Sequence, residues 1–328
     1  MEIDKRISNE DGHTHPWHHI IKSDTNFGGF YSSMIPDTET DFGFYRPNPF
    51  FNFLISLAQR TPHNWLGQQI AQIVRILVLR QVKLPIDVSV GPIKMRCYMW
   101  DNNSERKFTF MPWRFDRKER RLLKKILPRN GTFVDIGANV GIYTLDAATN
   151  LGAGGTVVAL EPNPLAFNRL CFNLKATQSG PTDWPKTHAL QVGVSDTTGD
   201  LELHLDPKNL GSSSIIKRPG PASSAGAVTG ETIRIHCKSL LQILEKLSIF
   251  RIDALKIDIE GAEDIALFPF LNQAPKEILP DYIFMENSER IWKLDLVGAL
   301  RQRGYIVKMR TRRNTVYQNI LMRHVGDI

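Results

Sequence analysis

One stretch of the chain, residues 133–144, restricts its fold more than any other; it reads FVDIGANVGIYT. A short apolar run ends in a glycine-rich turn, and a helical pattern follows at once. A second apolar run, Thr156–Leu160, comes next and is followed by Glu161. This order predicts a strand, a tight turn, a helix, a strand and a carboxylate. Together they form the first half of a nucleotide-binding α/β unit.

The residue types in this unit suit a bound nucleoside. Glycine at 137 and 141 lets the backbone turn sharply and lets a ligand lie against the main chain. The carboxylate of Glu161 can accept two hydrogen bonds from a ribose diol. The alternative is a purely structural turn in a parallel α/β domain.

The spacing of the turn excludes two common nucleotide motifs. A dinucleotide fingerprint G-x-G-x-x-G starting at Gly137 requires glycine at 139 and 142, where this chain has Asn139 and Ile142. No G-x-x-x-x-G-K-[ST] phosphate loop is present. The pattern that fits is D-x-G-x-N-x-G, formed by Asp135, Gly137, Asn139 and Gly141.

This pattern resembles motif I of the class I S-adenosylmethionine-dependent methyltransferases, in which the middle position is usually glycine. The variant with asparagine is typical of the FkbM-like branch. The resemblance covers residues 85–328 and includes three further segments: Glu161-Pro162-Asn163-Pro164, Val194-Ser195-Asp196, and the run Asp253–Glu263, which contains K-I-D-I-E-G-A-E.

The resemblance implies S-adenosylmethionine as cofactor and assigns residues to it. The methionine end is assigned to Asp135, Gly137, Asn139 and Gly141, and the ribose hydroxyls to Glu161, with Asn163 nearby. The turn that contains Ser195 and Asp196 is expected to face the adenine. The implied fold is a Rossmann-like class I methyltransferase sheet with an N-terminal extension over residues 1–84.

The hydrophobic pattern independently predicts alternating strands and helices, as in a mostly parallel sheet covered on both faces. The last two strands are joined by only Arg310–Asn314, too short for a crossover helix, so they must form an antiparallel hairpin. The seven expected strands are 132–136, 156–160, 188–194, 254–259, 281–286, 304–309 and 315–323. The expected helices are 141–149, 164–176, 238–247, 262–269 and 289–303.

The strand Leu255–Ile259 is expected beside the first strand, where ligands bind in open α/β sheets. Strands of a parallel sheet are normally apolar on both faces, so acids at the end of this one require a reason. Asp258 is the best candidate for a catalytic base or acceptor-orienting group, followed by Glu260 and Glu263. Alternatively, Asp258 pairs with Lys256 or caps the helix that begins near Ala262.

The strand that follows ends on Glu286-Asn287. Some class I O-methyltransferases bind Mg²⁺ with an Asp after the fourth strand and an acid–Asn pair after the fifth. Asp258, Glu286 and Asn287 would then supply three oxygen ligands to a hard cation. The competing interpretation makes Glu286 a substrate-binding carboxylate.

The extension has two parts. Residues 1–50 lack periodicity and indicate a mobile or loosely docked arm. Its histidines could hold a metal but are more typical of a solvated segment: His13, His15, His18 and His19. Residues 65–80 form an amphipathic helical pattern, which packs on the domain or a partner, or makes peripheral membrane contact. A basic amphipathic helix is expected at 117–127, as a solvated cationic face or as a nucleic-acid or lipid-headgroup patch.

An insertion separates the third and fourth core strands. Residues 200–206 and 232–237 alternate like strands, and 207–230 are rich in Gly, Ser, Pro and Ala. In FkbM-like proteins this region resembles a substrate lid, with Asn209, Ser213 and Ser214 as polar contacts here. A loop without a role is the alternative.

Composition adds few limits. The net charge of +7 is compatible with an acidic substrate, anionic lipid or nucleic acid. Cys97, Cys171 and Cys237 suggest buried thiols in a reducing compartment. The N-terminus lacks the apolar core of a secretory signal, and the most apolar segment, 70–79, is far shorter than the roughly 20 residues that span a bilayer. A cytoplasmic protein is expected.

We therefore predict an O-methyltransferase acting on a hydroxyl of a sugar, glycolipid or secondary metabolite, a small-molecule or glycan acceptor. Nucleic acid is a less favoured partner. The chain lacks both the [ND]-P-P-[YF] motif of base N-methylation after Leu255–Ile259 and the Pro-Cys pair of C5 methylation. An RNA ribose methyltransferase and a non-catalytic nucleotide-binding protein remain the alternatives. The oligomeric state is left open.

Overall fold

The computed structural model describes residues 35–180, 182–206, 209–216 and 232–321. The described residues from Pro36 onward belong to one compact unit. The four histidines near the N-terminus and most of the Gly- and Ser-rich loop lie outside the described residues.

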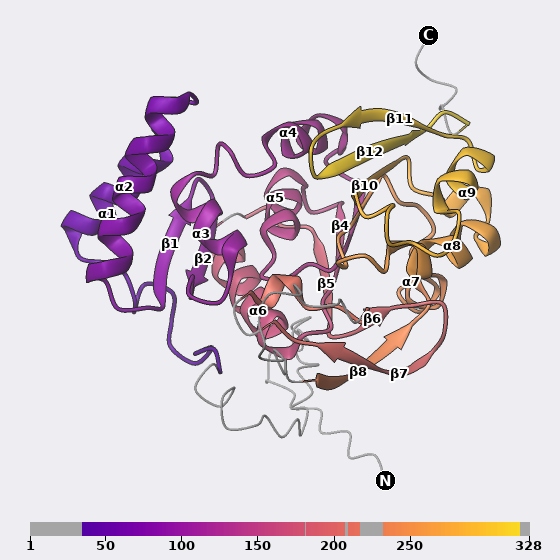
Figure 1. Ribbon diagram of the computed structural model, residues 1–328, viewed down its shortest axis with the longest axis horizontal. Helices are drawn as coiled ribbons and strands as arrows, with labels where there is room; N and C mark the ends of the chain where they lie inside the picture. Colours follow the sequence, from indigo (N-terminus) through magenta and orange to yellow (C-terminus); the bar gives the residue numbers. More distant parts are fainter. Residues whose placement is uncertain (1–34, 181, 207–208, 217–231, 322–328) are drawn as a thin grey trace. The chain divides into compact units, whose positions relative to one another are not determined.

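Within the described residues, one seven-stranded sheet forms the centre of the fold, in the order β11-β12-β10-β9-β3-β4-β5 (Figure 1). Its neighbouring strands are parallel from β5 to β10, and β12 pairs antiparallel with both β10 and β11. The predicted C-terminal hairpin and mostly parallel sheet are confirmed. The strands are β3 (Thr132–Ile136), β4 (Thr156–Leu160), β5 (Lys186–Leu190), β9 (Ala254–Ile257), β10 (Tyr282–Glu286), β11 (Tyr305–Arg310) and β12 (Asn314–Asn319).

Helices cover both faces of this sheet, because the central strands carry buried apolar side chains on both sides. Phe133 packs in a cluster with residues of α4 and α5, whereas Val134 and Ile136 pack in the opposite layer with α7, α8 and α9. The last three helices lie together on the right in Figure 1. The bounds are α4 (Arg117–Ile126), α5 (Ile142–Asn150), α7 (Leu240–Lys246), α8 (Glu263–Gln273) and α9 (Leu296–Gln302).

The described residues before α4 form further elements, and β2 joins them to the core by contacting α6 (Pro164–Gln178). The helix predicted over residues 65–80 is confirmed, whereas the first helix, α1, was not predicted, and β1 pairs antiparallel with β2. Their bounds are α1 (Pro49–Gln59), α2 (Trp65–Gln81), β1 (Ile86–Val90), β2 (Ile93–Cys97) and α3 (Asn103–Phe110).

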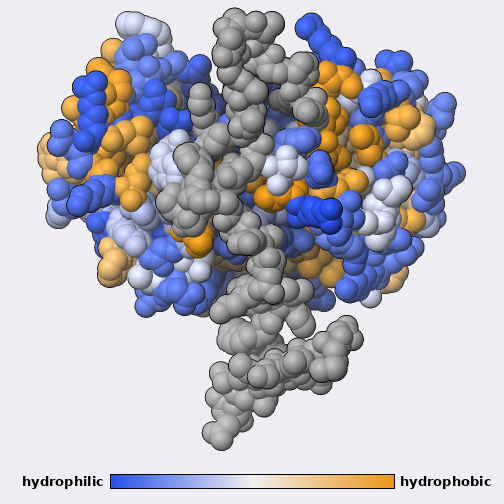
Figure 2. Space-filling view, turned by 60° about the horizontal axis from the view of Figure 1, so that its bottom comes forward, coloured by the Kyte–Doolittle hydropathy of each residue, from blue (hydrophilic) through white to orange (hydrophobic). Residues whose placement is uncertain are grey.

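Helix α2 buries its small residues and exposes large apolar ones. Ala71, Val74 and Val78 are buried, whereas Trp65, Ile73 and other apolar side chains are exposed. Figure 2 shows hydrophobic residues at the left edge of the molecule, the side on which Figure 1 places α1 and α2. None of the helices in the described ranges has the length and apolar character to cross a bilayer.

The insertion folds into a small second sheet with the order β6-β8-β7. It contains β6 (Gly193–Val194), β7 (Gly199–His204) and β8 (Thr232–Lys238), so the two predicted strands are confirmed. The strand predicted at 188–194 is wrong as one element, since it divides between β5 of the large sheet and β6 of the small one.

The helix predicted at 289–303 is also wrong in its first half: α9 begins only at Leu296. Two buried acids of α8 hold the residues just before α9 in a non-helical conformation. The Trp292 indole donates to Glu263 at 2.9 Å, and the amides of Lys293 and Leu294 donate to Asp264 at 2.7 and 3.0 Å. These hydrogen bonds take the place of those within a helix. The periodicity of the sequence could not reveal them, because their acceptors lie on another helix.

A buried ion pair anchors the residues before the core. Arg169 of α6 contacts Asp101 at 2.8 and 2.5 Å and Glu105 at 3.4 Å, and all three side chains are inaccessible to solvent. The next residue, Asn102, donates to Asn139 in the turn after β3 at 2.9 Å. The pair therefore positions the glycine-rich turn as well as α3.

We expect Arg169→Ala to destabilise the fold by about 3–5 kcal/mol, because it leaves two carboxylates buried without their cation. The matched control is Arg310→Ala, which removes an exposed pair with Glu289 and should cost less than about 1 kcal/mol. Urea unfolding of both variants measures the difference. Equal losses would show that the buried pair does not anchor the fold.

Candidate active site

The turn between β3 and α5 is held by the neighbouring strand β4. The amides of Gly137 and Ala138 both donate to the carbonyl oxygen of Leu160, at 2.9 and 3.0 Å. Gly137, Asn139 and Gly141 have φ angles of 75°, 51° and 93°. Glycine adopts such angles without strain, and asparagine tolerates them better than most residues. Asn139 can therefore occupy the position where related motifs carry glycine.

Gly137 is required for a second reason. A Cβ built on it would collide with the carbonyl oxygen of Asp258, which directly follows β9. The main chains of β3 and β9 thus approach closely at their carboxyl ends. This is the edge of the sheet at which open α/β folds bind ligands.

Glu161 lies at the end of β4, where the sequence places it beside a ribose. Its buried carboxylate accepts hydrogen bonds from the amides of Asn139 and Asn163, at 2.7 and 2.9 Å. Burial raises the pKa of Glu161 to about 7. Because each carboxylate oxygen accepts more than one hydrogen bond, Glu161 retains capacity for a diol in the pocket that it lines.

Asn163 supports this corner of the site. Its side chain caps α6 by accepting from the Leu165 amide at 3.0 Å, and its amide nitrogen lies 3.5 Å from the Ser213 hydroxyl. The structure therefore places Asn163 beside Glu161, with its side chain engaged in a helix cap.

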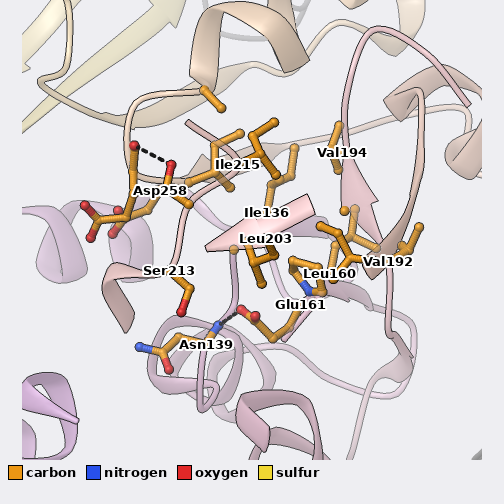
Figure 3. Close-up of a pocket in the computed structure, with 18 of the residues that line it drawn as sticks. Ile136, Asn139, Leu160, Glu161, Val192, Val194, Leu203, Ser213, Ile215 and Asp258 are labelled. Atoms are coloured by element: carbon orange, nitrogen blue, oxygen red, sulfur yellow. Dashed lines mark hydrogen bonds between the residues drawn. The ribbon is translucent and has the colours of Figure 1, made fainter. Parts of the chain in front are cut away.

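A narrow pocket, here the first pocket, lies over the carboxyl ends of β3, β4 and β9. Figure 3 shows Asp258 at one end and Val192 and Val194 at the other, with Ile136 and Leu160 between them. Its walls are largely apolar, which suits a flat aromatic ring. Residues 192–194 line one wall of the pocket. They directly precede the turn with Ser195 and Asp196, which the sequence predicted to face the adenine.

Ser195 and Asp196 do not line the first pocket. The Ser195 hydroxyl donates to Asp196 at 3.0 Å, and the Ser195 amide donates to the carbonyl of Lys238 at 3.1 Å. The bond to Lys238 attaches the turn to β8, and the bond to Asp196 lies within the turn. The apolar residues just before it face the pocket instead.

Residues 209–216, which belong to the loop between β7 and β8, close one side of the site. Leu210, Ser213 and Ser214 line the first pocket. The Leu210 amide donates to the Asp101 carbonyl at 2.8 Å, and the Ser214 hydroxyl donates to the Glu260 carbonyl at 3.0 Å. The predicted polar contact Asn209 lines a neighbouring cavity and accepts from the Asn103 amide at 3.2 Å.

That neighbouring cavity, here the acidic cavity, has a volume of about 400 Å³ and shares Gly137, Asn139 and Asp258 with the first pocket. Its floor contains a buried cation, Lys256 of β9. The Lys256 ammonium lies 3.2 Å from the Asp258 carboxylate and 4.9 Å from the centre of the Tyr143 ring. The alternative predicted for Asp258, a pair with Lys256, is therefore present.

Asp135 lies directly beside this cation, because it is the register partner of Lys256 on β3. One of its oxygens accepts from the Thr144 hydroxyl at 2.6 Å, and the other is buried and has no hydrogen-bond partner in the described part of the chain. Burial raises the pKa of Asp135. A buried acceptor that lines the cavity fits an ammonium group such as that of a methionine moiety.

Three carboxylates meet at the mouth of this cavity. Asp258, Glu260 and Glu286 each offer an oxygen within 4.8 Å of the others. Burial, followed by repulsion from Asp258 and Glu260, raises the pKa of Glu286 to about 8. The cluster can therefore bind or release a proton near neutral pH.

Two residues predicted with this cluster lie elsewhere. The carboxylate of Glu263 accepts from the amides of Ile259 and Gly261, both at 3.1 Å, so it shapes the turn after β9. The amide group of Asn287 donates to the Thr311 carbonyl at 3.1 Å and accepts from Thr315 at 2.6 Å. Glu260 takes the place in the cluster that the sequence suggested for Asn287.

Comparison with known proteins identifies the family. Residues 135–307 match the Methyltransferase FkbM domain, which covers more than half of the 328-residue chain. The chain belongs to the FkbM methyltransferase family. The resemblance found in the sequence is thereby confirmed, and with it the methyltransferase class of the domain.

Individual relatives are more distant. Methyltransferase sdnD of Sordaria araneosa is 28% identical over 161 residues, 42% of this chain and 59% of that protein, so the chain spans less than two thirds of this relative. The O-methyltransferase from Bacillus cereus in complex with SAH is 14% identical, with 62% and 80% of the two chains covered and a TM-score of 0.34. An rRNA methylase from Streptococcus thermophilus is 12% identical, with 62% and 95% covered and a TM-score of 0.35.

Sequence reasoning missed several residues of the cavity. Lys107 lines it from α3, and Asp116 lines it from the position just before α4. Arg313 lines it from the turn between β11 and β12, and Asn314 from the first position of β12. No local motif marks them, since folding alone brings these segments to the ends of β9 and β10. Lys256 was detectable as a charged residue within an apolar strand.

We expect Gly137→Ala to destabilise the protein more than Gly91→Ala. Both glycines have positive φ, so each substitution costs about 1–2 kcal/mol of backbone strain. Only Gly137 also meets the Asp258 carbonyl, whereas a Cβ at Gly91 meets nothing within 4 Å. Denaturant unfolding compares the two, and equal costs would exclude the close approach of β3 and β9.

Proposed function

We propose that this protein is an S-adenosylmethionine-dependent O-methyltransferase. Its acceptor would be a hydroxyl on a sugar, glycolipid or secondary metabolite. The observation that carries the proposal is the position of the three-carboxylate cluster, which adjoins both the glycine turn and the pocket of Glu161. The family match supports the class of reaction.

We assign each part of the cofactor by the polarity of the residues that line the two cavities. Glu161 would accept hydrogen bonds from the ribose hydroxyls, and the apolar stretch 192–194 would face the adenine. Asp135, with its unpartnered oxygen, and the Gly137–Gly141 turn would hold the methionine end. Glu263, Ser195 and Asp196 would act as positioning residues that shape the two turns.

Cofactor binding requires movement of the 209–216 segment. The first pocket, which would receive only the nucleoside end of the cofactor, holds only about 60 Å³, and the methionine end would lie in the adjoining cavity of about 400 Å³. The strands that form its floor are fixed by the sheet, so the segment above must shift outward. This supports the predicted role of the insertion as a lid.

When bound, the cofactor supplies an electrophilic methyl group on a sulfonium. The protein must align the acceptor oxygen with that carbon and take the hydroxyl proton. We assign proton uptake to Asp258 together with Glu286, because strongly interacting carboxylates titrate as a unit. Lys256 holds Asp258 in place, and Glu260 stands beside it as a second acceptor-orienting group.

The same cluster could instead hold Mg²⁺ through Asp258, Glu260 and Glu286, which offer three oxygen atoms. Lys256 opposes this function, since its ammonium already lies 3.2 Å from Asp258. We therefore favour proton transfer. Activity that EDTA removes and Mg²⁺ restores would assign the cluster to metal binding.

Asp258→Asn should lower the rate of methyl transfer by about 10²–10⁴-fold, the usual contribution of a placed base. Transfer of labelled methyl from S-adenosylmethionine into extracts of the source cell measures the rate. Calorimetry with S-adenosylhomocysteine should show that the cofactor product still binds.

The matched control is Asp295→Asn, an exposed helix cap at which asparagine also caps well. It should leave transfer unchanged. Full activity in Asp258→Asn would remove the base assignment, whereas absence of cofactor binding in the unmodified protein would remove the methyltransferase proposal and leave a non-catalytic chain.

The rate should also depend on pH through Glu286. Its pKa is raised to about 8, so the carboxylate pair takes up a proton, and kcat/KM falls, as pH drops below that value. Glu286→Gln should remove this inflection, because it removes the carboxyl whose raised pKa causes it. A profile unchanged by the substitution would contradict the pairing.

A further inference from the structure

A larger groove opens into the acidic cavity. It has a volume of about 890 Å³ and lies between α2, the start of α4 and the turn between β11 and β12. Lys107, Phe115, Asp116 and Arg313 line both the groove and the cavity. A molecule in this groove can therefore reach the three carboxylates.

The groove carries a strong excess of positive charge. Arg75 of α2 and Lys107 of α3 face Arg114, Arg117 and Lys118. The β11–β12 turn adds Arg312 and Arg313, so seven cations surround two acids, Asp116 and Glu119. Among the described residues, none of the seven takes part in a salt bridge within 4.0 Å.

The two acids of the groove offset only part of its positive charge, because seven cations line the same groove. Glu119 is buried and accepts from Thr311 at 2.6 Å, and Asp116 accepts from the Tyr143 hydroxyl at 3.2 Å. The pKa of Lys107 is lowered by burial and then by Arg313. The cations thus repel one another, and an anion would relieve this.

The groove also holds hydrogen-bond donors with no acceptor. The Trp113 indole nitrogen and Arg117 Nε are buried, and neither has a hydrogen-bond partner among the described residues. The Trp113 ring stacks on His63, with centroids 5.0 Å apart and planes 19° apart. Trp65, which is 71% exposed, lies in the same lining. Aromatic faces beside unpartnered donors suit a ligand with both a planar or apolar part and an anionic part.

We propose that this groove binds an anionic group of the methyl acceptor: a phosphate, sulfate or carboxylate. Bound there, the anion would hold the acceptor so that its hydroxyl extends past Lys107 and Arg313 to Asp258 and Glu286. This proposal rests on the proposed function, since it narrows the acceptor of that same site.

The size of the groove favours a small acceptor over a nucleic acid. Its volume falls within the range of sites for small molecules. A single-stranded nucleic acid instead needs a basic track that follows several nucleotides. The seven cations surround one depression rather than a track.

The test measures binding of inorganic pyrophosphate by calorimetry at low salt, on the full chain with S-adenosylhomocysteine present. We expect binding that weakens at least about tenfold in Arg75→Gln and in Arg117→Gln, because each removes a charged hydrogen-bond donor. Arg234→Gln, an exposed cation on β8, is the matched control and should bind as the unmodified protein does.

Three outcomes would overturn the proposal: no heat with pyrophosphate, equal binding in groove and control variants, or displacement of pyrophosphate by a 12-nucleotide RNA with a steep salt dependence. Titration of S-adenosylhomocysteine alone reports separately on the proposed function. If S-adenosylhomocysteine does not bind but pyrophosphate does, the proposed enzyme function is excluded and anion binding by the groove is still supported.

Discussion

The buried ammonium group of Lys256 is the interaction on which the site depends. Burial alone would lower its pKa, but the carboxylates of Asp258 and Asp135 outweigh burial and raise it, so the group stays charged. A cation in the middle of a parallel sheet is costly unless paired. Paired here, it allows acidic side chains to gather at the ends of β3 and β9, where an apolar sheet would otherwise exclude them.

The segments around this charge come from distant parts of the chain. The Arg169–Asp101 pair fixes α3 against α6, and Asn102 then holds the turn at Asn139. From the other direction, the β11–β12 turn brings Arg313 to the mouth of the same cavity. The sheet forms the floor of the site, and segments outside the sheet add the remaining lining residues, as is usual where loops on a common scaffold form a site.

Much of the architecture was readable locally. The apolar runs predicted the core strands, and the short Arg310–Asn314 connection predicted the hairpin, because two strands joined so closely can only run antiparallel. Helix α9 was overestimated, since contacts from Glu263 and Asp264 are invisible to periodicity. Asn287 was grouped with the acids by its neighbour in sequence, yet its side chain turns toward Thr311 and Thr315.

By itself, the sequence determined the parallel sheet, the glycine turn and the acids Glu161 and Asp258 at strand ends. The alternation of strands with helices and the glycines of a tight turn depend on residues close together in the sequence, so a single sequence predicts them. Only the tertiary structure decided that Glu260 joins Asp258 and Glu286, that Glu263 shapes a turn, and that seven cations surround one groove. These depend on which remote segments pack together, a matter of long-range contacts that no local pattern encodes.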